Sequence, residues 1–264
     1  DSTDKENPEK KLTWYNAMTG LVKGTISNAT KWYYISKGVY TQATGFAQRA
    51  DGSNTEWYYV LDGAFRKLSG ISRKIDTSVD TNWYYGQDGL MSLTSSGLAK
   101  RADGSNKVWY YVENGVFTKS TGLAQRADGS SSVLYYVSDG KLTKSTGIAK
   151  KIDGSDSKWY FVNNGVFTKA TGIAQKADGS SKVWFFVLDG VFTKSTGLAK
   201  KADGSSASWY YVKDGKFNKT TTIATRAYGT STTQYYVKNG TFNKTTGTVK
   251  VSGVSYKLVN GIVQ

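Results

Sequence analysis

Short apolar runs separated by turn residues recur along almost the whole chain, and a regularly spaced glycine marks their period. The spacing is 25 residues, except for 27 residues between Gly70 and Gly97. In most repeats this glycine follows Thr or Ser. The marked positions are Gly20, Gly45, Gly70, Gly97, Gly122, Gly147, Gly172, Gly197, Thr222 and Gly247. A fixed period of this length predicts a repeat architecture, in which each unit buries its apolar face against its neighbours.

Each unit has the pattern of two or three short strands. Residues 196–220 read TGLAKKADGSSASWYYVKDGKFNKT, with extended segments expected at 197–202, 209–212 and 216–220. The Asp-Gly or Asn-Gly pair after the aromatic run is a strong hairpin signal, because both residues tolerate positive φ. One such hairpin cannot bury an apolar face alone. The pattern therefore predicts an all-β fold, an elongated solenoid of tandem β-hairpin repeats.

The period also divides the chain. Residues 1–11 are polar and charged and are expected to form a linker. Residues 12–264 are expected to form a single repeat array, with a half repeat at 12–19, nine full repeats at 20–246 and a short capping repeat at 247–264. The 27-residue repeat, 70–96, is expected to carry a bulge or an altered site.

The aromatic run of each repeat, WYYV in its commonest form, has three aromatic slots. Because side chains alternate along a strand, the first and third slots share one face. The second slot is always Tyr or Phe, which predicts core, whereas the first also accepts Leu134 and Gln234 and is expected to be half exposed. Exposed rings can stack on sugars or enclose a quaternary ammonium. The candidate ligand-binding aromatics are Trp32, Trp57, Trp83, Trp109, Trp159, Trp184, Trp209, Tyr59, Tyr111, Phe161, Phe186 and Tyr211. The alternative is that the Trp residues only pack between hairpins.

Charge follows the same period. The chain has 35 Lys and Arg against 20 Asp and Glu, a net charge of +15, which favours anionic partners. A first basic ladder consists of Arg49, Lys74, Arg101, Arg126, Lys151, Lys176, Lys201 and Arg226, and its members other than Lys74 are the candidate anion-binding residues. A second consists of Lys67, Lys119, Lys144, Lys169, Lys194, Lys219 and Lys244. Alternatively, these lysines only discourage edge-to-edge association.

Little in the composition supports catalysis. Cys and His are both absent, which removes thiolate nucleophiles, the usual zinc ligands and the commonest general base. The repeated Asp of the first turn (Asp51, Asp103, Asp128, Asp153, Asp178 and Asp203) precedes Gly and is explained by turn chemistry. We therefore expect no catalytic residue, no metal site and no cofactor, and the chain is not expected to be an enzyme.

The motif T-G-x-x-x…W-Y-Y-V-x-D-G…T-G resembles the cell-wall-binding repeats of Gram-positive surface proteins. That superfamily includes choline-binding repeats and the glucan-binding repeats of glucansucrases. The resemblance covers roughly residues 12–264 and implies a β-hairpin solenoid that attaches to a wall polymer or α-glucan without catalysis. Choline-binding repeats are usually shorter and place Trp directly after T-G, where this chain has Leu, Ile, Phe or Thr. The difference implies that the three-sided choline cage is absent, and it favours the glucan-binding branch.

Together these patterns predict a carbohydrate-binding module for polysaccharide, either α-glucan or a bacterial cell-wall glycopolymer. The alternatives are a structural or adhesive stalk, or anchoring to anionic teichoic-acid-type polymers through the basic ladders. We expect no nucleic acid partner. We expect no membrane insertion either, since no apolar run of 18 residues or more occurs. The module is expected to be extracellular, secreted or attached to the cell surface, within a larger secreted protein that could be an enzyme.

Overall fold

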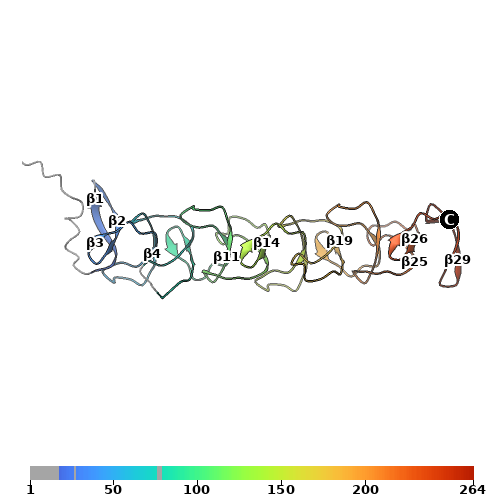
Figure 1. The fold of residues 1–264 in the computed structure, drawn as a ribbon, viewed down its shortest axis with the longest axis horizontal. Helices are drawn as coiled ribbons and strands as arrows, with labels where there is room; N and C mark the ends of the chain where they lie inside the picture. The colour runs from blue at the N-terminus through green and yellow to red at the C-terminus, as the bar shows by residue number, and fades with distance from the viewer. Residues whose placement is uncertain (1–17, 27, 76–78) are drawn as a thin grey trace, which may run out of the picture. The chain divides into compact units, whose positions relative to one another are not determined.

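The computed structural model describes residues 18–26, 28–75 and 79–264. The predicted linker 1–11 and residues 12–17 of the predicted half repeat lie outside the described residues. Every regular element of the described chain is a β-strand, and none is a helix (Figure 1). The all-β prediction, with tandem antiparallel hairpins, is confirmed.

Each full repeat contributes three strands. The first repeat contains β1 (Gly20–Ile26), β2 (Ala29–Ser36) and β3 (Val39–Tyr40). The first strands of the later full repeats are β4 (Gly45–Ala47), β7 (Gly70–Ser72), β10 (Gly97–Ala99), β13 (Gly122–Ala124), β16 (Gly147–Ala149), β19 (Gly172–Ala174), β22 (Gly197–Ala199) and β25 (Thr222–Ala224). The second strands are β5 (Tyr58–Leu61), β8 (Tyr84–Gln87), β11 (Tyr110–Glu113), β14 (Tyr135–Ser138), β17 (Tyr160–Asn163), β20 (Phe185–Leu188), β23 (Tyr210–Lys213) and β26 (Tyr235–Lys238). The third strands are β6 (Ala64–Phe65), β9 (Leu90–Met91), β12 (Val116–Phe117), β15 (Lys141–Leu142), β18 (Val166–Phe167), β21 (Val191–Phe192), β24 (Lys216–Phe217) and β27 (Thr241–Phe242). The last repeat contains β28 (Gly247–Val251), β29 (Val254–Val259) and β30 (Ile262–Val263).

The chain divides into two compact units. The first comprises the residues up to Ser120 together with Gln125–Ser132 and Asp139–Leu142. The second comprises Thr121–Ala124, Val133–Ser138 and Thr143–Gln264. The fifth repeat, 122–146, thus contributes segments to both units.

Backbone pairing links each repeat to the next. In the second repeat, β4 pairs antiparallel with β5, and β5 with β6. Tyr58 then pairs with Leu90 in the third strand of the following repeat. A parallel bridge joins Phe46 to Lys74, a member of the first basic ladder, so the ladder residues lie where one repeat meets the next.

The Asp-Gly turns have the predicted hairpin geometry. Asp62 and Gly63 have φ values of 51° and 75°, the left-handed pair of a type I′ turn. The amide of Asp62 donates a hydrogen bond of 3.2 Å to the hydroxyl of Thr44, and the amide of Asp88 donates one of 2.9 Å to that of Ser69. The Thr or Ser before each marking glycine therefore holds the hairpin turn of the same repeat.

The marking glycine is required by the next repeat. Gly147 has a φ of 153°, and a Cβ built on it would lie 2.5 Å from the carbonyl oxygen of Gln175. At the ninth position the residue is Thr222, which has no positive φ. The following repeat, 247–264, lacks four residues of its first turn, the segment that meets the glycine elsewhere. A neighbouring backbone thus approaches all eight marking glycines from Gly20 to Gly197, whereas a Cβ on Gly247 would have no atom within 4 Å.

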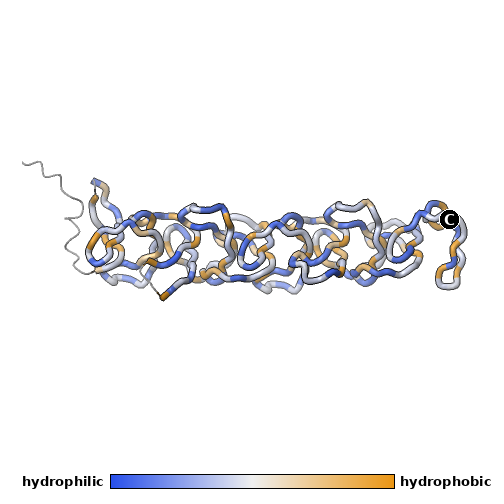
Figure 2. Tube along the Cα trace, viewed as in Figure 1, coloured by the Kyte–Doolittle hydropathy of each residue, from blue (hydrophilic) through white to orange (hydrophobic). Residues whose placement is uncertain are grey.

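The core lies between successive repeats. Leu21 and Tyr34 of the first repeat form one buried cluster with Ala47 and Val60 of the second. Ile173 and Phe186 pack in the same way with Ala199 and Val212. Second strands such as β5 and β20 are therefore covered on both faces, one by the preceding repeat and the other by the following repeat. Apolar and polar segments alternate along the chain as this requires (Figure 2).

Burial on both faces corrects the prediction for the second and third slots. The third slot is core: Tyr59, Phe161 and Phe186 have 0% of their surface exposed. Tyr111 is 2% and Tyr211 8% exposed. These five predicted ligand contacts offer no free ring face, because they are covered by the next repeat and by a side chain of the same repeat, Phe46 at Tyr59 and Leu or Ile at the other four. The second slot, predicted to be core, is half-buried in every repeat from the second to the ninth.

Candidate functional site

An aromatic site forms at the junction between the first two repeats. Trp32, at the centre of β2, faces Tyr58 and Phe65 from β5 and β6 of the following repeat, above the buried Leu21. These side chains and Arg49 enclose a cavity of about 60 Å³. The ring centroids of Tyr58 and Phe65 are 5.9 Å apart in an edge-to-face contact. We call this arrangement, with Trp from one repeat and the other rings from the next, the junction cage.

The cage recurs with the repeat spacing, although Met91 and Leu142 take the place of the third-strand Phe at the junctions that follow Trp57 and Trp109. In the second unit, Leu198 and Trp209 meet Arg226, Tyr235 and Phe242 around a cavity of about 40 Å³. The second-slot ring and the third-strand ring make similar edge contacts in other repeats, as at Tyr160–Phe167, with 5.8 Å between centroids. The predicted half-exposed character of the Trp slot is confirmed, since all seven Trp residues are half-buried.

The first basic ladder lies inside these cages. The cation of each ladder residue that follows a Trp-bearing repeat lies 4.6–5.0 Å from the ring centroid of that Trp. The pairs are Arg49 on Trp32, Lys74 on Trp57, Arg101 on Trp83, Arg126 on Trp109, Lys176 on Trp159, Lys201 on Trp184 and Arg226 on Trp209. Such cation–π contacts contribute about 0.5–1 kcal/mol each at exposed sites. The cages are thus built to hold a positive charge.

The two ladders differ in exposure. Seven of the eight members of the first ladder are half-buried, and Arg226 is exposed next to the shortened last repeat. The charges of the first ladder face the Trp rings, so an anion could contact only part of each charged group. All seven lysines of the second ladder are exposed. The second ladder is therefore the more accessible row of charge.

Some Trp residues hold a second cation. Lys100, directly before Arg101, lies 4.9 Å from the ring centroid of Trp109 in its own repeat, while Arg126 lies 4.8 Å from the same ring. In three other repeats the position of Lys100 is Gln (Gln48, Gln125 and Gln175), and the side-chain amide of Gln175 donates a hydrogen bond of 3.0 Å to the carbonyl oxygen of Lys182. Where this position is Gln, fewer cations lie over the Trp ring of that repeat.

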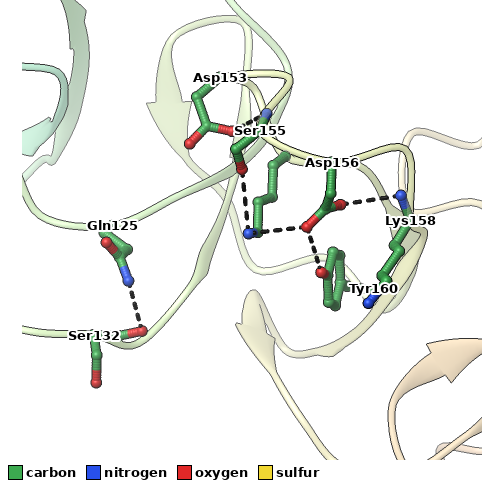
Figure 3. Close-up of polar contacts among 8 residues, drawn as sticks. Gln125, Ser132, Asp153, Ser155, Asp156, Lys158 and Tyr160 are labelled. Atoms are coloured by element: carbon green, nitrogen blue, oxygen red, sulfur yellow. Dashed lines mark hydrogen bonds and ion pairs between the residues drawn. The ribbon is translucent and has the colours of Figure 1, made fainter.

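In two repeats a carboxylate holds the ladder lysine. Lys151 lies 3.0 Å from Asp156, which also accepts a hydrogen bond of 2.7 Å from the hydroxyl of Tyr160 (Figure 3). Lys74, Asp80 and Tyr84 repeat this arrangement. The Tyr160 hydroxyl, followed by the Lys151 ammonium, lowers the pKa of Asp156 to about 2. Lys151 has no Trp to contact, because the slot holds Leu134, and its ammonium lies 5.6 Å from the ring centroid of Tyr160.

The repeated Asp residues form turns, as predicted. The carboxylate of Asp51 accepts the amide hydrogen of Ser53 at 3.0 Å, and that of Asp103 accepts from Ser105 at 2.9 Å. The same hydrogen bond, from the amide of the residue two positions later to the carboxylate, occurs at Asp128, Asp153, Asp178 and Asp203. In the described part of the chain, no three acidic side chains come together in a way that could hold a metal ion. Nor does that part contain a helix long and apolar enough to cross a membrane.

Sequence reasoning missed two of the three cage rings. The second-slot aromatics, such as Tyr58 and Tyr235, were assigned to the core, and the third-strand Phe residues were not singled out. It also inferred from the Leu or Ile after T-G that a three-sided cage is absent. The structure brings three rings together without that position, because Leu21 and its equivalents form the buried floor. The one sequence feature that could have predicted the three-ring contact is the repeat architecture, because stacked repeats must cover both faces of each hairpin.

Comparisons with known proteins show a likeness in parts of the sequence. The family model described as a choline-binding repeat matches residues 18–39, 102–116 and 194–218. Among solved structures, the chain is similar to that titled "Structure of CbpJ from Streptococcus Pneumoniae TIGR4", at 17% identity over 93% of this chain and 94% of that chain, with a TM-score of 0.30. A TM-score this low gives no support to any shared arrangement of the repeats. No curated protein matches the sequence.

The three matched segments carry the aromatic run, the Asp-Gly turn or the T-G position of different repeats. The repeats of this chain are therefore choline-binding-repeat-like.

Proposed function

We propose that this chain is a non-catalytic module that attaches to a bacterial cell-wall glycopolymer bearing quaternary ammonium groups. One observation supports it above the others. Each of the seven Trp residues already has a cation of the chain itself over its ring. A ring that holds a guanidinium or ammonium at this distance can hold the trimethylammonium of choline by the same attraction.

Binding would be an exchange of cations. A quaternary ammonium has no N–H donors and is weakly hydrated. The lysine ammonium at three of the Trp residues is strongly hydrated and regains that hydration when it leaves the ring, whereas the Arg guanidinium at the other four is more weakly hydrated and regains less. The exchange is expected to be close to balanced at each junction. Individual sites would therefore bind weakly, and several cages engaging one polymer would supply the affinity.

The test is retention on purified walls that either carry or lack choline. We expect retention on choline-bearing walls, release by free choline, and loss of at least tenfold in the double variant Trp109→Ala/Trp184→Ala. The matched control is Val108→Ala/Val183→Ala, which truncates the exposed apolar residues next to the same two Trp residues. Equal retention on walls without choline, or unchanged retention of the Trp variant, would refute the proposal. The latter result would favour the structural stalk.

An α-glucan is the second candidate ligand. It is favoured by Trp57 and Trp184, each with one ladder cation over its ring, where a sugar could stack once that cation moves aside. Retention on insoluble dextran at high salt, lost in Trp57→Ala/Trp184→Ala, would support it. In either case we propose that the module acts at the cell surface, as part of a larger secreted protein.

A further inference from the structure

The junction that follows the 27-residue repeat contains a larger cavity than the two junctions described above. Its volume is about 300 Å³, against about 60 Å³ at Trp32 and 40 Å³ at Trp209. It is lined by Ile71, Trp83, Arg101, Tyr110, Phe117, Lys119, Asp139 and Lys141. The volume is enough for one sugar ring, as judged against ordinary ligand pockets of about 300–1,000 Å³.

Volume and one lysine, Lys141, distinguish this cavity from the other two. Lys119, Asp139 and Lys141 join the usual cage residues, from the end of one repeat and the hairpin of the next. The position of Lys141 is Leu90 at the first junction and Ile262 at the last. The cavity therefore has a cation at its edge where the other two have an apolar side chain, while the positions of Lys119 and Asp139 are polar at all three junctions.

Arg101 supplies a donor without a partner. Its guanidinium lies 4.7 Å from the ring centroid of Trp83, and one terminal nitrogen pairs with the carboxylate of Asp103 at 2.7 Å. Its Nε atom is buried and has no hydrogen-bond partner among the described residues. A buried N–H of a charged group is costly to leave unpaired, so a ligand acceptor here would be favoured.

We infer that this cavity binds a single anionic sugar residue. The rings of Trp83, Tyr110 and Phe117 offer the apolar faces on which a pyranose stacks. Arg101, Lys119 and Lys141 attract a carboxylate or phosphate carried by that sugar. Asp139 accepts hydrogen bonds from hydroxyl groups.

This ligand differs from the ammonium of the proposed function. Arg101, Lys119 and Lys141 outnumber Asp139 and the Asp103 carboxylate that pairs with Arg101, so an anion is favoured over a quaternary ammonium here, and the other six Trp residues remain for the proposed function. The same repeat array would thus hold ammonium groups at ordinary cages and an acidic sugar at this one. Such a combination suits a polymer that carries both groups.

The test is calorimetric titration of the full chain with glucuronic acid, glucose 6-phosphate and glucose. We expect one site per chain for at least one of the acidic sugars and binding at least tenfold weaker for glucose. Lys119→Ala/Lys141→Ala should weaken acidic sugar binding by about tenfold or more, since each cation contributes a charge-assisted contact. The matched control Lys169→Ala/Lys244→Ala removes the same charge from the second ladder, at exposed lysines outside the cavity.

A preference for glucuronic acid identifies a carboxylate ligand, and one for glucose 6-phosphate a phosphate. Equal binding of glucose, or an equal loss in both double variants, would overturn the inference. So would binding of neither acidic sugar. Retention on choline-bearing walls is measured on the same variants and is expected to be unchanged, so the two proposals can fail separately.

Discussion

Substitution of Gly147 by alanine should disrupt the packing between the sixth and seventh repeats. The Cβ would lie 2.5 Å from the Gln175 carbonyl oxygen and 2.6 Å from the Ala177 amide nitrogen. Ordinary contact begins near 3.4 Å, so this backbone must move by about 0.9 Å. Between these two residues lies Lys176, the cation over Trp159. The substitution therefore disturbs the packing and the cage together.

The expected cost has two parts. An L-residue held at a φ of 153° costs about 1–3 kcal/mol. The movement also breaks the hydrogen bonds from Ile148 to Gln175 and from Ala177 to Ile148, of 2.7 and 3.0 Å, at about 1 kcal/mol each. We expect a total of about 3–5 kcal/mol. Gly247→Ala is the matched control, because Gly247 has a φ of 122° but no atom within 4 Å of its Cβ, so only the first part applies.

Hydrogen exchange read by mass spectrometry is the suitable assay, because repeat proteins open locally and need not unfold in two states. Peptides containing Ile148 and Ala177 should lose protection in Gly147→Ala and keep it in Gly247→Ala. Equal loss in both variants, or a Gly147→Ala variant as stable as Gly247→Ala, would refute the reasoning that the next repeat imposes the glycine.

Two further predictions concern the tyrosines and the loop carboxylate. The Tyr59 and Tyr85 hydroxyls are buried without a described partner, so Tyr59→Phe/Tyr85→Phe should leave the free energy of unfolding unchanged or raise it by up to about 1 kcal/mol. Tyr160→Phe, which loses the bond to Asp156, should lower it; urea titrations giving the reverse order would contradict this. The Asp156 pKa is depressed to about 2, so its contribution is present above pH 3.8 and lost as pH falls through 2. Asp156→Asn should flatten that acid slope, and a carboxyl NMR titration midpoint near 3.8 would disprove the contact.

The sequence by itself determined the fold class, the period and the turns. Asn-Gly and Asp-Gly pairs fix hairpins locally, because residues such as Asp62 and Gly63 adopt positive φ with little help from the rest of the chain. The repeated Asp, as at Asp51, was also assigned correctly, since its hydrogen bond spans two residues. The half-exposed Trp slot could be inferred by comparing repeats, because Leu134 and Gln234 occupy it.

Only the tertiary structure decided which rings are buried and which meet. Alternation along a strand tells which side chains share a face, but it does not tell whether either face is exposed. In this chain both faces are covered, Tyr59 toward the following repeat and Val60 toward the preceding one. The cages and the cations within them join residues from different repeats, such as Trp32 and Arg49, so no single repeat contains a complete site. They exist because the repeats stack closely, with glycine at the point of closest approach. The sequence gives the position of that glycine but not the distance between the repeats.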